Sequence, residues 1–449
     1  MDFSSTQSEA LYARFCQTLD SILPQSVQSV LIAYSGGADS ALLLDFFVRL
    51  SKERKLSLHA LHFNHMIRKE ADEDAAFCET VCQSHGIPLK IVKEDVPAYA
   101  QAHKMGLEEA ARYLRYKALE TYQQEQNLDC IATAHNATDN TETVLFHLAR
   151  GSALQGICGI SPKRNAVIRP FLPFSKDEIL ASVNAEQIPY CEDATNADRT
   201  YTRNFIRHEI LPKLEVINPS LHEAVWRFSQ TAREDDDALT AMAEAYRDVT
   251  DTKALASLPR AILRRVLLIK YRKIAHNEVR SDQLAASCEK LSLAAENRFS
   301  GMVTFPGNWV LSINAKETNF YRNGISPIDT PIPLSRDSDF IFQGRYRITV
   351  TAPKPTDAPL VTLAVSEETL SHLSVRSRQN GDRYRQNHMT RSVKKMLCDC
   401  KIPAVLRDTL PIILYQNEIL FVMHLPISDR YQTLRNESQN SYHISIYKV

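Results

Sequence analysis

Residues 31–40 read Leu-Ile-Ala-Tyr-Ser-Gly-Gly-Ala-Asp-Ser, and this stretch constrains the fold more than any other part of the sequence. The apolar run Val30–Ala33 predicts a buried strand, the two glycines predict a turn, and the apolar pattern of Ala41–Leu50 predicts a helix. A strand that turns through glycines into a helix exposes backbone N–H groups at the positive helix end, where proteins bind anions. The sequence therefore predicts an α/β sheet with an anion-binding loop after one of its strands.

The loop itself carries groups suited to phosphate. Its glycines permit positive φ angles and a close approach of the backbone to a ligand, while its serines and aspartate add hydroxyls and a carboxylate that suits Mg²⁺. No Gly-Lys-Ser/Thr sequence follows, and the glycine spacing of dinucleotide-binding folds is absent, so the loop belongs to neither of those classes. The predicted phosphate-binding residues are Ser35, Gly36, Gly37, Ala38, Asp39 and Ser40, with Asp39 as the predicted metal ligand.

Short apolar runs alternate with amphipathic segments up to about Pro189, which predicts a doubly wound parallel sheet. Ligands of such sheets bind beside the carboxyl ends of the strands, so polar residues that follow a strand are candidate site residues. The predicted strands are Val30–Ala33, Leu58–Phe63, Leu89–Val92 and Cys130–Ala134, and the predicted helices are Ala41–Ser51, Glu70–His85, Leu107–Gln126 and Thr138–Ala149.

The chain has 449 residues, enough for two or three domains. We predict an α/β domain over 1–215, a mostly helical middle domain over 216–325 and a small α+β domain over 340–449. In the middle domain, Leu221–Asp248 and Ala261–Ile274 have helical patterns, although Lys270 interrupts the apolar stripe of the second. Gly324–Asp339 contains three prolines and predicts a linker.

Composition is that of an ordinary globular protein, with 44% hydrophobic and 24% charged residues and a net charge of zero. No apolar run approaches the length of a membrane span, and residues 1–20 lack a signal-peptide pattern, so we expect no membrane partner. Nine scattered cysteines without a Cys-x-x-Cys pair are typical of free thiols in a reducing compartment. These features together predict a cytoplasmic protein.

Two histidines end the second predicted strand, in the sequence His62-Phe63-Asn64-His65. A histidine pair can hold a metal or form hydrogen bonds within the fold. Because this segment lies at the carboxyl end of a strand, we favour contact with a nucleotide over binding of zinc. His62 and Asn64 are the predicted contact residues.

The predicted helix that begins at Leu107 carries Glu108, Arg112, Arg115 and Tyr116 at spacings of three and four, along one face. Such a face is commonly a salt-bridged surface. Arginines beside tyrosines also suit an anion joined to a base, because guanidinium grips phosphate and tyrosine stacks.

The segment His135-Asn-Ala-Thr-Asp139-Asn-Thr-Glu142 follows the fourth predicted strand and opens a helix. Spacings of four and three allow His135, Asp139 and Glu142 to point toward one site. Asp139 also suits a helix start, which is its structural alternative. Together with Asp39 it is expected to share a metal or to position an amine.

Two later segments are rich in basic residues. Arg199, Arg203 and Arg207 recur every four residues, a spacing typical of a solvated helix face or of an anion-binding one. Between residues 376 and 407 nine basic residues outnumber two acidic ones, with Tyr384 among them, which is the charge pattern of a polyanion-binding surface. The nine are Arg376, Arg378, Arg383, Arg385, Arg391, Lys394, Lys395, Lys401 and Arg407.

Taken in order, these motifs resemble the tRNA(Ile)-lysidine synthetase family, whose loop is that of the N-type ATP pyrophosphatases. The resemblance rests on the Ser-Gly-Gly-x-Asp-Ser loop, the His-x-Asn-His strand end, the Glu-x-Ala-Arg-x-x-Arg-Tyr helix and the His-x-x-x-Asp-x-x-Glu-Thr segment. Arg169-Pro170, the Arg-Asn-x-x-Arg stretch at Arg203 and the Val-Arg-x-Arg-x-x-Gly-Asp-Arg segment at Val375 extend it. It covers roughly residues 28–215 and 373–424.

The resemblance implies an enzyme that ligates lysine to C2 of the wobble cytidine in a CAU-anticodon tRNA(Ile), through an adenylated tRNA, with release of AMP and pyrophosphate. ATP and Mg²⁺ are the implied cofactors, and that tRNA and L-lysine the implied partners; a homodimer stays open. The implied catalytic residues are Asp39, Asp139, His135 and Arg112, and the implied tRNA-binding residues are Arg115, Arg203, Arg207, Arg376, Arg378, Arg383, Arg385, Lys394 and Lys395.

The sequence departs from the family at Asn140, where glutamine is usual, and at Arg385-Gln386-Asn387-His388, where Arg-Pro-x-Gly is usual. Ser392-Val393 also replaces the usual Lys-Leu. Three other functions are compatible with the loop. A tRNA thiolase is disfavoured because Cys-x-x-Cys is absent, an amidating ligase leaves the basic segment unexplained, and an inactive tRNA-binding protein conflicts with the intact loop.

Overall fold

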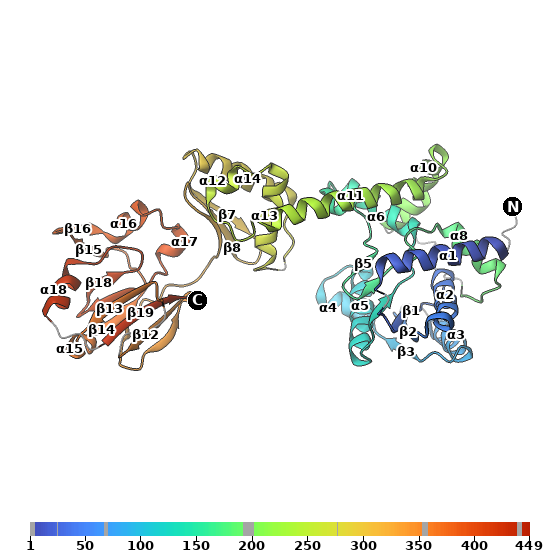
Figure 1. Ribbon diagram of the computed structural model, residues 1–449, viewed down its shortest axis with the longest axis horizontal. Helices are drawn as coiled ribbons and strands as arrows, with labels where there is room; N and C mark the ends of the chain where they lie inside the picture. Colours follow the sequence, from blue (N-terminus) through green and yellow to red (C-terminus); the bar gives the residue numbers. More distant parts are fainter. Residues whose placement is uncertain are drawn as a thin grey trace. The chain divides into compact units, whose positions relative to one another are not determined.

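The computed structural model describes residues 5–24, 26–66, 71–191, 202–275, 277–352, 358–437 and 442–449 (Figure 1). It divides into two compact units, Met1–Asp237 and Ala238–Val449, and the division falls within helix α11 (Leu221–Glu244). The predicted domain limits stay predictions. None of the helices in the described part of the chain combines the length and apolar character that crossing a bilayer requires.

The first unit is built on a six-stranded sheet in the order β3-β2-β1-β4-β6-β5. All neighbouring strands are parallel except β5, which runs antiparallel to β6. The strands are β1 (Ser29–Ala33), β2 (Ser57–Asn64), β3 (Leu89–Lys93), β4 (Cys130–Ala132), β5 (Lys163–Arg164) and β6 (Val167–Ile168). The predicted parallel sheet is confirmed, although its fourth strand ends two residues earlier than predicted.

Helices cover both faces of this sheet (Figure 1). In β1, Val30 and Ile32 belong to one hydrophobic core and Leu31 belongs to the other. Because both faces are buried, the strands are continuous apolar runs rather than alternating ones. The first core includes residues of α1 (Ser5–Ile22), α2 (Ala38–Arg54), α3 (Ala71–Ser84) and α8 (Lys176–Ala185), and the second includes residues of α4 (Val96–His103) and α5 (Leu107–Glu125).

The strand order makes the carboxyl ends of β1 and β4 a topological switch point of the sheet. Since β2 lies on one side of β1 and β4 on the other, the connections after β1 and β4 diverge at the carboxyl edge of the sheet. Helix α2 follows β1 there, and α6 (Ala137–Ala149) follows β4. The unit continues through α7 (Leu154–Ile157), α9 (Thr202–Phe205), the π-helical turn η2 (Ile206–Ile210) and α10 (Leu211–Ile217) to α11.

The second unit begins with a mostly helical part, as predicted. Helices α12 (Thr252–Ala256), α13 (Arg260–Arg272) and α14 (Ser281–Ala295) share a core with the antiparallel strands β7 (Gly301–Phe305), β8 (Trp309–Ile313) and β9 (Thr318–Arg322). Lys270 interrupts the apolar stripe of α13, and its buried ammonium donates to Val249 O at 2.6 Å.

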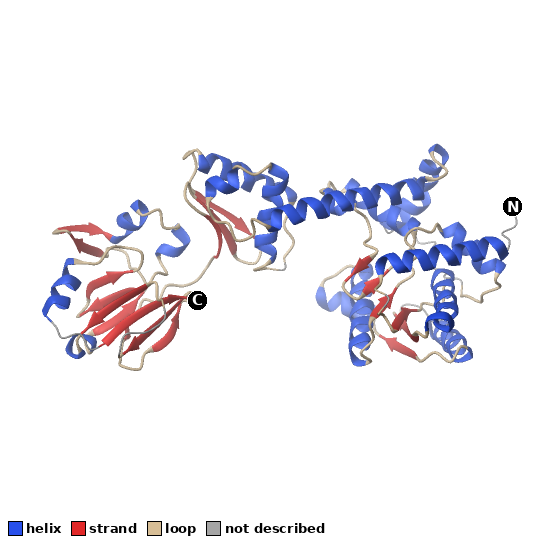
Figure 2. Cartoon of the chain, in the orientation of Figure 1, coloured by secondary structure: helices blue, strands red, loops and turns tan. Residues whose placement is uncertain are grey.

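The C-terminal part contains two four-stranded sheets, in the orders β10-β14-β17-β18 and β11-β12-β19-β13, and a β15-β16 hairpin (Figure 2). Its strands are β10 (Ile332–Pro333), β11 (Asp339–Phe342), β12 (Tyr346–Thr351), β13 (Val361–Val365), β14 (Leu373–Arg376), β15 (Arg383–Gln386), β16 (Met389–Ser392), β17 (Ile412–Tyr415), β18 (Glu418–Val422) and β19 (Tyr442–Lys448). Its helices are α15 (Glu367–Leu370), α16 (Val393–Asp399), α17 (Ala404–Arg407) and α18 (Asp429–Glu437).

The linker prediction over Gly324–Asp339 is wrong in part. Ile332 pairs with Val375 in β14, and Leu334 is buried in the C-terminal core. This segment joins the sheet because burial of the Ile332 and Leu334 side chains offsets the conformational entropy that the backbone loses.

Candidate active site

The loop after β1 is shaped by its own hydroxyls. The Ser40 hydroxyl donates to Gly37 O (2.9 Å) and lies 3.0 Å from the Ser35 hydroxyl. Gly36 has a φ of 87°, whereas Gly37 has an ordinary φ of −74°. A Cβ on Gly36 would lie 3.1 Å from Cys78 Sγ, but one on Gly37 would meet only the Ser35 hydroxyl at 3.7 Å. One of the two glycines therefore needs a positive φ, and the other leaves the start of α2 open to a ligand.

Asp39, in the first turn of α2, is bonded to a residue that sequence analysis missed. Lys176 Nζ donates to Asp39 Oδ2 at 2.7 Å, while Asp39 Oδ1 is buried and has no hydrogen-bond partner among the described residues. Lys176 comes directly after Ser175, which caps α8. A basic residue in the first turn of a helix is unfavourable, because its charge opposes the helix dipole. This unfavourable placement is the signal in the sequence that could have pointed to Lys176.

Asp39 suits Mg²⁺, because a buried carboxylate oxygen that lacks a donor requires a cation. Within the described ranges no three His, Cys, Asp or Glu side chains form a complete metal-binding group. Phosphate oxygens and water would therefore supply the remaining ligands, as is usual for Mg²⁺. The predicted role of Asp39 in binding Mg²⁺ stays a prediction.

The start of α6 positions Asp139 through a capping box. Asn136 Oδ1 accepts from Asp139 N (3.1 Å), and Asp139 Oδ2 accepts from Asn136 N (3.0 Å). Asp139 thus does cap the start of α6, but this role uses only one of its two carboxylate oxygens. Burial raises the pKa of Asp139, the Asn136 N–H opposes this shift, and the nearby charge of Asp39 adds to it. A carboxylate with a raised pKa is a better proton acceptor.

His135 lies between β4 and α6, with its Nδ1 2.9 Å from Thr133 Oγ1. Burial and the charges of four arginines lower the pKa of His135 well below the ordinary imidazole value. The imidazole is therefore neutral at physiological pH. The four are Arg115, Arg169, Arg112 and Arg203.

The arginines of α5 gather around Tyr116. The guanidinium carbons of Arg112 and Arg115 lie 5.2 and 5.8 Å from the centre of its ring. Arg169, which is buried, donates to the Tyr116 hydroxyl (3.2 Å) and to Ser161 O (2.8 Å). This face of α5 therefore gathers positive charge beside His135, while its Glu108 forms an ion pair with Arg203.

Two arginines from the segment after residue 201 contact carboxylates of α5 and α6 in this site. Arg207, in η2, donates from Nε to Glu142 Oε1 (2.5 Å) and from Nη2 to Asp139 Oδ1 (3.4 Å). Arg203 donates to Glu108 Oε1 and to Thr143 Oγ1, both at 3.1 Å. Burial raises the pKa of Glu142, and the bond from Arg207 opposes this shift. Arg199 lies outside the described residues.

His62 and Asn64 are engaged within the protein. His62 is buried with its Nδ1 3.1 Å from Tyr34 O. Asn64 is also buried, and its amide donates to Ala71 O and Asp72 Oδ1, both at 3.1 Å. His62 thus contacts the segment after β1, and Asn64 ties the end of β2 to the start of α3; their contact with a nucleotide stays a prediction.

In the C-terminal part, the nine basic residues between 376 and 407 differ in burial and in whether they form ion pairs. Arg376 is buried and bonded to Asp382 twice, at 2.7 and 2.9 Å. Arg378 is paired with Asp408, and Arg391 with Asp399 (2.6 Å). Four exposed side chains pair with no other described residue: Arg383, Lys394, Lys395 and Lys401.

The expectation that Tyr384 belongs to this basic surface is wrong. Its ring is fully buried, and its hydroxyl donates to Pro426 O at 2.6 Å. Residues alternate between the faces of β15, so Tyr384 faces the core while Arg383 and Arg385 are exposed. At the tip of the hairpin, Asn387 and His388 both have positive φ and donate their N–H groups to Asp429.

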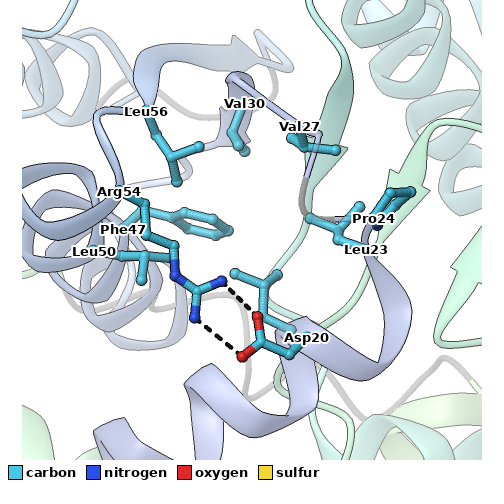
Figure 3. A pocket seen from close by; sticks show the side chains of 10 residues that line it. Asp20, Leu23, Pro24, Val27, Val30, Phe47, Leu50, Arg54 and Leu56 are labelled. Carbon is cyan, nitrogen blue, oxygen red and sulfur yellow. Dashed lines mark hydrogen bonds and ion pairs between the residues drawn. The ribbon is translucent and has the colours of Figure 1, made fainter.

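A small cavity lies at the opposite edge of the first sheet (Figure 3). It measures about 60 Å³, and the Asp20–Arg54 ion pair lies beside it. Val27 and Leu56 precede β1 and β2, so this cavity is at the amino ends of the strands, away from the loop at Asp39.

The doubly wound sheet, the Ser-Gly-Gly-x-Asp-Ser loop and the carboxylates after β1 and β4 define a PP-loop protein. Residues 7–214 match the family model of the PP-loop domain, and residues 373–444 match that of the TilS substrate C-terminal domain. The two matches together confirm the resemblance to the tRNA(Ile)-lysidine synthetase family that the sequence motifs indicated.

Three relatives illustrate the likeness. A tRNA(Ile)-lysidine synthase of Thermosipho africanus is 41% identical, over 50% of this chain and 53% of its own length. The bifunctional protein TilS/HprT of Listeria monocytogenes is 30% identical, over 89% of this chain and 65% of its own length. A tRNA(Ile)-lysidine synthase of a Thermotoga species is 29% identical, over 90% of this chain and 92% of its own length. The chain thus spans between about half and two thirds of the first two relatives.

Proposed function

We propose that this chain is an ATP-dependent ligase that joins L-lysine to C2 of the wobble cytidine in a CAU-anticodon tRNA(Ile), in the cytoplasm. One observation carries the proposal. Asp39 and Asp139 follow adjacent strands, one beside a phosphate loop and the other beside a neutral imidazole and four arginines. Such a site suits a reaction that activates a base with ATP and then admits an amine.

In the proposed first step, the cytosine O2 attacks the α-phosphorus of ATP, and pyrophosphate leaves. The N–H groups at the start of α2 and the Ser35 hydroxyl hold the phosphates, so the charge of the leaving group meets donors already in place. Mg²⁺ bound at Asp39 would neutralise phosphate charge. Arg112 is assigned to the α-phosphate, because guanidinium binds phosphate through two parallel bonds.

In the proposed second step, the lysine ε-amine attacks C2, AMP leaves and the amine gives up a proton. Free lysine is mostly protonated at neutral pH, with a pKa of about 10.4. Asp139 binds this ammonium and accepts its proton, which suits the raised pKa of its carboxyl. Arg207 is bonded to Asp139 and Glu142, so binding of the lysine ammonium at Asp139 Oδ1 requires the Arg207 guanidinium to move away from this oxygen.

The proposed tRNA contacts fall in two groups. Arg115, Arg203 and Arg207 lie around the reaction site, and the exposed basic residues of the β15-β16 hairpin and α16 lie in the C-terminal part. These charges support binding of the phosphate backbone with strong salt dependence. Arg376 and Arg378, also predicted to bind tRNA, are placed to hold the loop between β14 and β15.

A tRNA thiolase is the nearest alternative. Sulfur transfer needs a reactive thiolate, but burial raises the pKa of the thiols nearest the loop: to about 11 for Cys82, to about 11 for Cys191, and for Cys78 further still. These observations favour the ligase.

The proposal is tested by incubating the purified chain with ATP, Mg²⁺, labelled lysine and an unmodified CAU-anticodon tRNA(Ile) transcript. We expect lysine label in this tRNA, none in a methionine tRNA, and one AMP released per lysine joined. AMP release without label would contradict lysine as the nucleophile, and tRNA binding without ATP cleavage would favour an inactive binding protein.

Replacement of Asp139 separates chemistry from helix capping. Asp139→Asn keeps an oxygen for the Asn136 N–H but loses the charge, so we expect normal folding with at least a hundredfold loss of lysine incorporation. Asp95→Asn, at the cap of α4, is the matched control and is expected to retain activity.

A further inference from the structure

The phosphate loop contains no positively charged side chain. Residues 35–40 include two serines, two glycines, an alanine and an aspartate, so their only cationic contribution is the partial charge of backbone N–H groups. A Walker loop, in contrast, carries its own lysine to the β- and γ-phosphates. With Mg²⁺ assigned to Asp39 and Arg112 to the α-phosphate, a protein cation for the β- and γ-phosphates must come from elsewhere in the chain.

The fold brings Lys176 to the loop from 137 residues away. Lys176 is the first residue of α8, which packs against α2, and its Nζ lies 2.7 Å from Asp39 Oδ2. Its side chain is 39% exposed and that of Asp39 is 30% exposed, so the ion pair is partly open to solvent.

Stability does not account for this lysine. An ion pair this exposed contributes at most about 1 kcal/mol, and the first turn of a helix disfavours a positive charge. Ser175 and Glu178 already supply the capping box of α8. The placement of Lys176 thus has a small structural benefit, but it puts an ammonium group beside the phosphate loop.

We propose that Lys176 is the phosphate-binding lysine of this site. In the structure its ammonium neutralises Asp39, whose second oxygen is buried and accepts no hydrogen bond from the described residues. With ATP bound, Asp39 would hold Mg²⁺ in place of the ammonium, and Lys176 would turn to the pyrophosphate part of ATP. This role deepens the proposed function, on which it rests.

The test compares Lys176→Met and Lys176→Arg with the wild-type chain, using α,β-methylene-ATP with Mg²⁺ and AMP as two calorimetric probes. We expect Lys176→Met to weaken binding of the ATP analogue at least tenfold and to leave AMP binding within twofold, because AMP lacks the pyrophosphate. Lys176→Arg keeps the charge and is expected to recover most of the affinity.

Mn²⁺ binding without nucleotide, followed by electron paramagnetic resonance, gives a second readout. Since Lys176 and the metal compete for Asp39, we expect Lys176→Met to bind Mn²⁺ at least as tightly as the wild type. A lysine that only docks α8 would weaken every ligand together.

Arg14→Met is the matched control, because it breaks another ion pair to α8, between Arg14 and Glu178 (2.5 Å). We expect it to change none of these affinities. Unchanged analogue binding in Lys176→Met, or equal losses for AMP and the analogue, would overturn the proposal. Because these are binding measurements, failure of lysine incorporation in the wild type would instead count against the proposed function alone.

Discussion

At the scale of single residues, the neighbouring glycines of the loop have different physical roles. Gly36 has a left-handed φ and lies against Cys78, while Gly37 has an ordinary φ and an open surface. We expect Gly36→Ala to lower the free energy of unfolding by about 1–3 kcal/mol. Gly37→Ala should fold normally but bind ATP at least tenfold more weakly, because a methyl group would occupy the place of a phosphate.

Urea denaturation and calorimetric titration with ATP measure the two effects separately. Gly37→Ala with wild-type affinity for ATP would show that the phosphates do not approach this backbone. Equal destabilisation by both substitutions would contradict the assignment of strain to Gly36.

His135 makes a pH-dependent contribution whose sign follows from its lowered pKa. Because the folded chain binds this proton less tightly than the unfolded chain, stability is fully present above the unfolded pKa of about 6.5 and falls as the pH drops below it. Glutamine does not titrate, so the His135→Gln variant lacks this loss of stability at low pH. Between pH 7.5 and 5.5 we expect the variant to lose less free energy of unfolding than the wild type, by up to about 1 kcal/mol.

Chemical denaturation at several pH values checks this expectation. Comparison with the wild type cancels the contributions of the other buried groups, such as Asp139. Parallel profiles for the two proteins would mean that His135 accepts a proton freely in the folded chain.

At the scale of elements, one buried amide joins three segments of the first unit. Asn140, in α6, accepts from Ile160 N (2.8 Å) and donates to Ser229 Oγ of α11 (3.2 Å). Gly159 leaves room for it, since a Cβ there would fall 2.1 Å from Asn140 Oδ1. Asn140, where the family usually has glutamine, thus lies in close contact with the loop at Gly159.

Loss of this amide should therefore loosen α11 from α6. We expect Asn140→Ala to lower the free energy of unfolding by about 1–3 kcal/mol, because it leaves a buried N–H unpaired. Ser229→Ala should cost less, and the double variant should show coupling in a mutant cycle. Additive effects would indicate that the Asn140–Ser229 bond contributes nothing measurable.

At the scale of the whole molecule, the two units carry different kinds of charge. The first holds Arg207 between the buried Glu142 and the half-buried Asp139, and the second exposes cations without a described partner on the β15-β16 hairpin and α16. The exposed cations suit a long polyanion, because each phosphate contact releases counterions from the nucleic acid.

We expect the triple variant Arg383→Ala, Lys394→Ala and Lys395→Ala to bind tRNA more weakly and to lose roughly two to three units of salt slope. Binding is measured over a range of salt concentrations. Lys52→Ala, Lys55→Ala and Lys90→Ala together remove the same charge from exposed positions of the first unit and serve as the control. Equal effects of the two triple variants would contradict a tRNA-binding surface in the C-terminal part.

Much of the fold follows from local patterns in the sequence. The apolar runs of β1 to β4, the glycines after β1 and the caps of α6 each act over a few residues, so a single sequence was enough to predict the parallel sheet and the place of its loop. The predicted proximity of Asp39 and Asp139 also follows, because neighbouring parallel strands end at the same edge.

Only the tertiary structure decided which charges are available. Lys176 meets Asp39 across 137 residues, and Arg207 meets Asp139 across 68. Tyr384 and Arg376 belong to a basic stretch of sequence, yet one is core and the other is buried in an ion pair. Composition counts charges along the chain, whereas burial and pairing depend on contacts between distant segments, and these form only when the chain has folded.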